Sequence, residues 1–203
     1  PDRRLPQNFE PTVRSEIEQG PDLVCFSGDK LLGGCQAGII VGAKDLVGRL
    51  RKNPLMRMLR VDKITYYILQ ETLLRHVNGE DDSIALWRIM HQDKKDISGR
   101  INRFLRLIAN PEGKKMLKKT ATMSTIGGGA VPGSRMESLG LWVDIPGMSA
   151  DDIYAALAEA DVPLIGIIME GRFTIDFSAI LDSDVAAAAK AVNGLIALHG
   201  GSR

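Results

Sequence analysis

A lysine in a glycine-rich segment is the residue of this sequence best suited to covalent chemistry. Lys30 lies in the string Ser27-Gly-Asp-Lys-Leu-Leu-Gly-Gly34, directly after the apolar run 22–26. A turn that is held by backbone on both sides can point such a lysine into a cleft. Burial and nearby positive charge there favour the free amine, which is the form that attacks a carbonyl carbon. Lys30 is therefore either a Schiff-base lysine or a solvated lysine in a tight turn.

The residues just before the lysine can bind a phosphate group. Ser27 carries a hydroxyl three residues before Lys30, and glycines such as Gly28 let an anion approach backbone N–H groups closely. Asp29 either hydrogen-bonds within the site, where it tunes the charge of the lysine, or shapes the turn. The segment thus predicts an anion-binding turn around a reactive lysine.

Two short strands are expected to flank this turn. The apolar runs 22–26 and 37–41 are rich in β-branched or aromatic residues, and the glycine-rich stretch separates them. A parallel pair needs a crossover of about a dozen residues or more, which this link barely approaches. We therefore expect the two strands to be adjacent and antiparallel.

Helices are expected after the strands. A basic helix at 44–52 should stop near Asn53-Pro54, because proline disfavours helical geometry in the residue before it. A longer helix should follow, and we expect its apolar face to pack across the domain. That face consists of Tyr66, Leu69, Leu73 and Val77, and two further helical segments are expected at 84–91 and at 97–109, the latter with Ile97, Ile101, Phe104 and Ile108 on one side.

A small α/β module is expected after residue 116. Its predicted elements are strands 120–126 and 139–143 around a turn at the glycines 127–129, a helix at 150–160 that Ser149 and Asp152 cap, a hairpin of 164–168 with 173–177, and a helix at 185–198. This order predicts an α+β layer, in which helices cover one face of a mainly antiparallel sheet. We place the domain boundary near 110–118, which gives domains 1–115 and 116–203.

The charge of the chain is distributed unevenly. The 203 residues contain 26 Lys and Arg against 25 Asp and Glu, but residues 44–119 alone have a net charge of +9. Such a segment either faces an anionic partner, such as phosphate or nucleic acid, or forms solvated helix faces. No apolar stretch approaches the roughly 18 residues of a membrane span. We expect a soluble, cytoplasmic protein without a membrane segment.

Several longer strings resemble one enzyme family, the bacterial selenocysteine synthases, which are L-seryl-tRNA(Sec) selenium transferases. The resemblance covers most of the chain and is looser from 81 to 119. The strings are Phe26-Ser-Gly-Asp-Lys-Leu-Leu-Gly-Gly34, Gln36-Ala-Gly-Ile-Ile-Val-Gly42, Asn53-Pro-Leu-Met-Arg-Met-Leu-Arg-Val-Asp-Lys63, Ser124-Thr-Ile-Gly-Gly-Gly129, Pro163-Leu-Ile-Gly166 and Glu170-Gly-Arg172.

The resemblance implies an α/β protein of the fold-type I class of pyridoxal 5'-phosphate enzymes. Residues 1–115 would be the carboxyl-terminal end of the large cofactor-binding domain, and 116–203 the small α+β domain. Lys30 would form the internal aldimine, with Ser27 and Gly28 at the cofactor and Asp29 as a second catalytic residue. The remainder of the large domain and a tRNA-binding domain would precede this region, so we expect the isolated chain to be inactive.

The implied reaction converts L-seryl-tRNA(Sec) to L-selenocysteinyl-tRNA(Sec). Loss of the α-proton and the β-hydroxyl leaves an aminoacrylyl-tRNA intermediate, and selenium from selenophosphate adds to its β-carbon. Lys30, once released, is the natural general acid or base. Arg57 and Arg60 match the pair of arginines that the family associates with the selenium donor. Two guanidinium groups at i and i+3 of one helical turn can reach one oxyanion, although a solvent-facing pair beside acidic neighbours is the alternative.

Some positions depart from the family pattern. Cys35 stands where proline is usual, so the turn after the lysine is less rigid. Ile167 and Ser178 fall where arginines are frequent, which puts substrate contacts in the second domain in doubt. The two cysteines, Cys25 and Cys35, are expected to be free thiols and form no metal motif. His76, His91 and His199 are assigned no role and are expected at surface or helix-end positions.

Two other functions remain open at this point. One is a related pyridoxal phosphate lyase that acts on a small amino acid or amino sugar. The other is a non-catalytic subunit that binds RNA or a partner chain through its basic middle. The resemblance also implies a homo-oligomer that is built from dimers and forms a larger ring.

Overall fold

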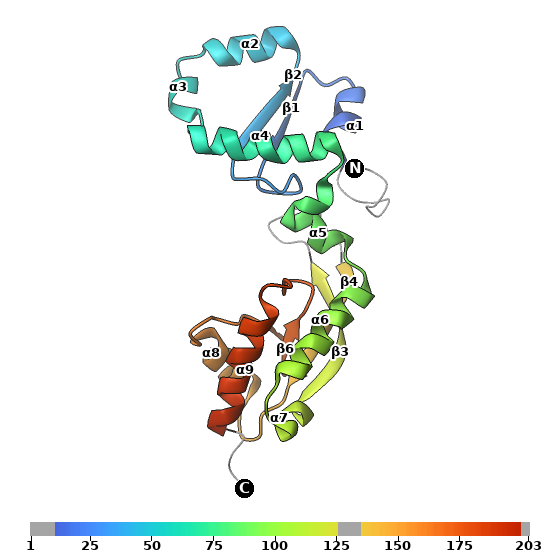
Figure 1. Cartoon of the computed structure of the whole chain (residues 1–203). Helices are drawn as coiled ribbons and strands as arrows, with labels where there is room; N and C mark the ends of the chain where they lie inside the picture. Colours follow the sequence, from blue (N-terminus) through green and yellow to red (C-terminus); the bar gives the residue numbers. More distant parts are fainter. Residues whose placement is uncertain (1–10, 126–134, 200–203) are drawn as a thin grey trace. The chain divides into compact units, whose positions relative to one another are not determined.

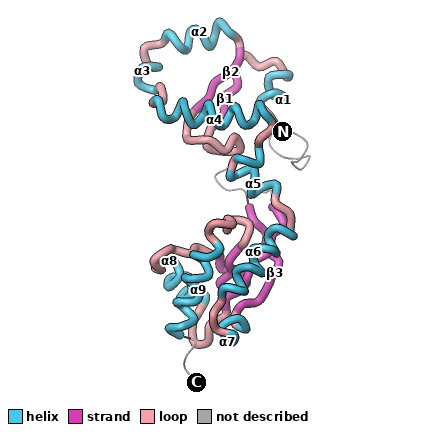
Figure 2. The backbone as a smooth tube through the Cα atoms, viewed as in Figure 1, coloured by secondary structure: helices cyan, strands magenta, loops and turns pink. Residues whose placement is uncertain are grey.

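The structure is a computed structural model that describes residues 11–125 and 135–199. The described chain divides into two compact units, which are 11–91 and 92–125 with 135–199. Figures 1 and 2 show the helices and strands of each unit. The fold is of the mixed α/β kind that the sequence predicts. Within the described residues, no helix is both long and apolar enough to cross a membrane.

The first unit is a two-stranded sheet with helices around it. Its strands pair antiparallel as predicted, with Cys25 opposite Ile40. The helix at 44–52 has the predicted bounds, whereas α1, α3 and the 3-10 helix η1 are too short to show a helical period in the sequence. The elements are α1 (Val13–Glu18), β1 (Leu23–Ser27), β2 (Gly38–Gly42), α2 (Lys44–Lys52), α3 (Met56–Leu59), α4 (Lys63–Asn78), η1 (Asp81–Ser83) and α5 (Ala85–His91).

Helix α4 differs from the prediction in the face that it buries. Leu69 is buried, but the other three residues of the predicted apolar face, Tyr66, Leu73 and Val77, are 60%, 43% and 82% exposed. The reason is that the turn between β1 and β2 lies against a narrow stripe of α4 formed by Leu69 and Thr72. The expectation that this whole face packs across the domain was therefore wrong for the described chain.

The second unit is a four-stranded antiparallel sheet with helices packed on it. The strand order is β3-β4-β6-β5, and the longest pairing aligns β3 with β4 from Leu117 opposite Val143 to Thr125 opposite Arg135. The elements are α6 (Lys94–Leu107), α7 (Pro111–Lys115), β3 (Leu117–Thr125), β4 (Arg135–Val143), α8 (Ala150–Ala158), β5 (Ile167–Met169), β6 (Arg172–Asp176) and α9 (Val185–His199). The predicted glycine turn at 127–129 lies outside the described residues.

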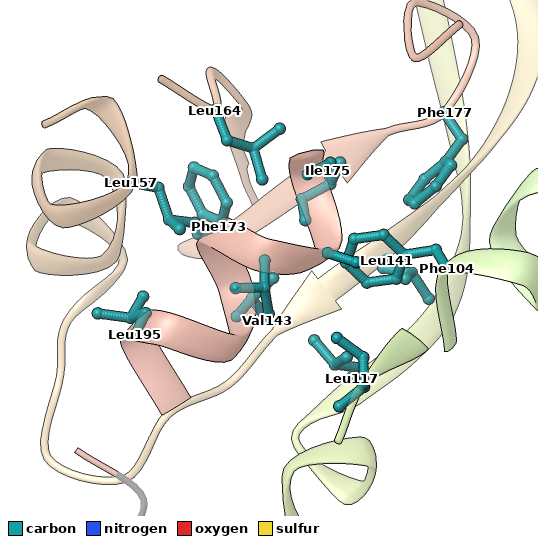
Figure 3. Packing of buried hydrophobic residues seen from close by; sticks show 14 of the residues in the cluster. Phe104, Leu117, Leu141, Val143, Leu157, Leu164, Phe173, Ile175, Phe177 and Leu195 are labelled. Carbon is teal, nitrogen blue, oxygen red and sulfur yellow. The ribbon is translucent and has the colours of Figure 1, made fainter. Parts of the chain in front are cut away.

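The hydrophobic core of the second unit includes helix α6. Phe104 of α6 is fully buried and meets Phe177 edge to face, with ring centroids 5.3 Å apart (Figure 3). The predicted α6 stripe is confirmed, because its members are all buried: Ile97, Ile101, Phe104 and Ile108. By packing, α6 and α7 thus belong to the second unit, although the sequence placed them in the first domain. Compact units need not coincide with domains of a family, so the division into 1–115 and 116–203 stays a prediction.

The hairpin of β5 and β6 is shorter than predicted on its first strand. Strand β5 begins at Ile167, and the tight turn at Glu170 and Gly171 has positive φ at both residues. Gly166 lies against the neighbouring strand, since a Cβ there would be 2.5 Å from the ring of Phe173. The Leu164 N–H donates to the Leu157 carbonyl of α8, at 2.9 Å, instead of to a strand, and the strand expected at 164–168 starts three residues late.

Candidate active site

The segment that carries Lys30 is a turn with its own backbone hydrogen bonds. At its base the Gly28 N–H donates to the Ala37 carbonyl, with N and O 2.8 Å apart. Inside it the Gly34 N–H donates to Gly28 and the Gly33 N–H donates to Lys30, at 2.8 and 2.9 Å. These bonds close the connection between β1 and β2 into one compact turn, with the lysine near its tip.

The glycines of this turn allow it to pack closely. A Cβ on Gly28 would lie 2.6 Å from the Cys35 carbonyl oxygen and 2.9 Å from the Leu69 side chain. Gly33 has a φ of +74°, and a Cβ there would lie 2.6 Å from Ile84. Both positions therefore require glycine. Because the Gly28 amide already donates to Ala37, the predicted binding of a phosphate depends more on the Ser27 hydroxyl, which has no hydrogen-bond partner within the described residues.

Lys30 and Asp29 are brought together by the turn. The Lys30 Nζ lies 3.6 Å from the Asp29 Oδ2, and the two side chains are 43% and 34% exposed. An ion pair that is this exposed contributes at most about 1 kcal/mol to stability. The amine is therefore reachable from solvent and is held only loosely. The described chain does not bury Lys30, and the charged group nearest to it in sequence is a carboxylate, so the burial and positive charge expected to favour the free amine are not seen here. A reachable primary amine fits the covalent attachment of an aldehyde cofactor.

Arg57 and Arg60 lie at the short helix α3. Arg57 is within the helix and Arg60 is its C-cap with extended backbone, so the two do not share one helical turn as the sequence suggested. Both are exposed, and neither makes an ion pair anywhere in the described ranges. The nearest acidic residue in sequence, Asp62, instead caps α4 by accepting from the Thr65 N–H, and that hydrogen bond lowers its pKa. Figure 1 shows α3 apart from the turn that carries Lys30.

Residues that the sequence did not single out contact the turn just after Lys30. The His76 Nε2 lies 2.9 Å from the Leu32 carbonyl oxygen, and the Trp87 Nε1–H donates to the Leu31 carbonyl at 2.8 Å. His76 is in the last turn of α4, which agrees with its predicted helix-end position, but its side chain is mostly buried. No local pattern could reveal these contacts, because 44 and 56 residues separate the partners.

Two of the three positions that depart from the family pattern, Cys35 and Ser178, make hydrogen bonds here. The Cys35 Sγ donates a weak hydrogen bond to the Thr65 carbonyl of α4, at 3.6 Å. Ser178 joins a cluster around Asp176, where its N–H donates to the carboxylate at 2.9 Å. Ile167 is half exposed at the start of β5. Both cysteines of the described chain, Cys25 and Cys35, are free thiols, and no group of three metal-binding side chains is found among the residues that the structure describes.

Comparison with known proteins identifies the family. A family model described as L-seryl-tRNA selenium transferase matches residues 3–181. The L-seryl-tRNA(Sec) selenium transferase of Clostridium perfringens strain 13 is 38% identical over 180 residues, which are 86% of this chain and 38% of the relative. Those of Geobacter sulfurreducens and Geotalea uraniireducens are 37% and 39% identical over 190 residues, which are 92% of this chain and 41% of each relative. The chain spans about two fifths of the length of these relatives, and it belongs to the L-seryl-tRNA selenium transferase family.

Proposed function

We propose that this chain carries the reactive lysine of a pyridoxal 5'-phosphate enzyme that converts L-seryl-tRNA(Sec) to L-selenocysteinyl-tRNA(Sec). The observation that carries the proposal is Lys30, whose amine is reachable at the tip of a turn that glycines shape. Family membership supports it, because the matched region includes this turn. In this proposal the protein is of fold-type I, with 1–115 in the large domain and 116–203 as the small domain. It acts as a cytoplasmic homo-oligomer.

Lys30 has two tasks in the proposed reaction. When bound, the cofactor supplies an electron sink for the bonds that break at the α-carbon of serine. The Lys30 Nζ would hold it covalently, and the Ser27 hydroxyl would bind its phosphate. With the substrate in place, the amine of Lys30 would accept the α-proton and return a proton to the departing β-hydroxyl. Asp29, 3.6 Å away, stabilises the ammonium form between these two transfers.

Arg57 and Arg60 bind the phosphate of selenophosphate in the proposed reaction. A guanidinium group donates two parallel hydrogen bonds to a phosphate, and both side chains are exposed without an acidic partner in the described part of the chain. In this proposal Lys30 acts on the seryl group, and the two arginines bind the selenium donor.

Steady-state kinetics with seryl-tRNA(Sec) and selenophosphate separate these roles. The experiment uses the longest natural polypeptide that contains these residues. Arg57→Ala and Arg60→Ala should each raise the KM for selenophosphate about tenfold or more, since a hydrogen bond to a charged group is lost. Loss of the β-hydroxyl from seryl-tRNA(Sec) should continue in both variants. Arg51→Ala on α2, another exposed arginine, is the control and should leave the KM unchanged. An unchanged KM in both α3 variants contradicts the assignment.

A second candidate function follows from the charge of residues 44–119. A net charge of +9 suits a chain that binds RNA or an acidic partner without catalysis. Salt-dependent binding of tRNA by a protein that never attaches the cofactor to Lys30 supports this second function. Turnover of a free amino sugar, with no turnover of seryl-tRNA(Sec), supports a related lyase instead.

A further inference from the structure

We infer that His76 and Trp87 are positioning residues that hold the backbone just after Lys30 and so fix the direction in which the lysine leaves its turn. Asp81 orients His76. This inference rests on the proposed function, because it concerns how the reactive lysine is presented. Neither residue touches the lysine amine, and both act through the main chain.

The two contacts fix consecutive peptide groups. Trp87 donates to the carbonyl of Leu31 and His76 contacts the carbonyl of Leu32, at 2.8 and 2.9 Å. Rotation of either peptide plane would break one of these bonds. The two bonds therefore fix the backbone conformation of the residues that directly follow Lys30. Inside the turn, the Gly33 N–H donates to the Lys30 carbonyl itself, which transmits this constraint to the lysine.

His76 is itself held from its other side. Its Nδ1 lies 2.5 Å from the Asp81 Oδ1, and both side chains are less than one fifth exposed. Each ring nitrogen of His76 thus has an oxygen partner, the Leu32 carbonyl for Nε2 and the Asp81 carboxyl group for Nδ1, and together these contacts fix the plane of the ring. The carboxylate of Asp81 thus sets the orientation of the ring, as second partners of functional histidines do.

The two positioning side chains also pack against each other. The rings of His76 and Trp87 meet edge to face, with centroids 5.8 Å apart, and Trp87 is 5% exposed. The turn contacts this pair closely, since a Cβ on Gly33 would lie 3.6 Å from the Trp87 ring. The end of α4, η1 and the start of α5 therefore form one support under the residues after Lys30.

Hydrogen exchange tests the support directly, without cofactor. Trp87→Phe keeps an aromatic ring but removes the N–H donor. His76→Leu removes both hydrogen-bond contacts of the imidazole. Each should speed exchange of the Gly33 and Gly34 amides about three- to tenfold, the effect expected for one lost hydrogen bond. Exchange in the middle of α4 should stay the same. Trp142→Phe is the matched control, because the Trp142 Nε1 has no partner within the described residues.

A second readout links the support to the lysine. The pyridoxal phosphate concentration that half-saturates borohydride labelling of Lys30 should rise in His76→Leu and be partly restored in His76→Gln, which keeps an N–H donor. Unchanged exchange at Gly33 and Gly34 overturns the inference, and so does an equal acceleration throughout α4, which indicates general loss of stability. If the wild type is never labelled, the proposed function fails, while the exchange data still decide whether the support exists.

Discussion

Asp176 shows how one charged residue joins three strands of the second unit. Its carboxylate accepts hydrogen bonds from the Ser124 hydroxyl at 2.5 Å, the Ser138 hydroxyl at 2.7 Å and the Ser178 N–H at 2.9 Å. Burial opposes ionisation of Asp176, but these hydrogen bonds outweigh it and hold the pKa of the carboxyl below its usual value of 3.8. Ionised Asp176 therefore stabilises the folded state.

Replacing this carboxylate should destabilise the second unit in a pH-dependent way. Asp176→Asn should lower the free energy of unfolding at pH 7 by about 1–3 kcal/mol, because hydrogen bonds to a charged acceptor are weakened. The folded pKa is depressed, so the contribution of Asp176 is complete above pH 3.8 and is lost as the pH falls through the lower folded value. Denaturant unfolding at several pH values measures the difference.

The control for this prediction is Asp161→Asn, because the Asp161 side chain is nearly fully exposed and its Oδ2 lies 4.0 Å from the Lys190 Nζ. Its unfolding free energy should match that of the wild type at every pH. If the unfolding free energies of the wild type and Asp176→Asn differ by the same amount at pH 7 and well below pH 3, the account of the cluster is contradicted.

At the residue scale, the sequence could predict the lysine but not its support. Lys30 is found because a distinctive string of neighbours surrounds it. His76 and Trp87 contact that string only after the chain has folded, because strand β2 and helices α2 and α3 lie between Lys30 and both residues in the sequence. The role of Ser178 could not be predicted either, because it depends on the register that brings β3, β4 and β6 together.

At the scale of elements, periodicity predicts which residues share a face but not whether anything covers it. Helix α6 and helix α4 both show an apolar stripe in the sequence. The α6 stripe is buried by the sheet and α9, whereas most of the α4 stripe is exposed in the first unit. Propensity and spacing are local, but burial depends on the partner that tertiary structure provides.

Helix α6 should contribute strongly to the stability of the second unit. Phe104→Ala should lower the free energy of unfolding by about 3–5 kcal/mol, since it removes a fully buried ring and leaves a cavity beside Phe177. Leu107→Ala, on the same helix but 46% exposed, should cost less than about 1 kcal/mol. Thermal and denaturant unfolding compare the two. Equal losses would contradict the assignment of α6 to the core of the second unit.

Helix α8 provides a smaller test at its first turn. The Ser149 side chain accepts from the Asp152 N–H at 3.1 Å, while Asp152 bonds back to Ser149, which forms the predicted capping box. Ser149→Ala should cost about 1 kcal/mol in unfolding free energy. Ser149→Asp, which retains a capping oxygen, should recover most of the loss, and no recovery would contradict a capping role.

At the scale of the whole molecule, the two units differ in how much apolar surface they bury. The large core cluster lies within the second unit, from α6 to α9. Among the described residues of the first unit, buried apolar side chains are few and several large ones on α3 and α4 are exposed. Because burial of apolar surface is the main source of stability, the units should differ in local stability.

Hydrogen exchange over the whole chain tests this difference. Amides of β4, β6 and α9 should exchange more slowly than those of β1, β2 and α4 under the same conditions. The expected gap is at least tenfold, since each 1.4 kcal/mol of local stability changes exchange by that factor. Equal protection in both units would show that the first unit is stabilised by contacts other than those of the described chain.

The central claim, that Lys30 holds pyridoxal 5'-phosphate, is tested most directly by borohydride reduction. The longest natural polypeptide that contains these residues is incubated with the cofactor, reduced and digested, and the modified peptide is located by mass. The account predicts a label on Lys30 that is absent in Lys30→Ala and retained in Lys63→Ala. A folded protein that carries no label on Lys30 would contradict the account.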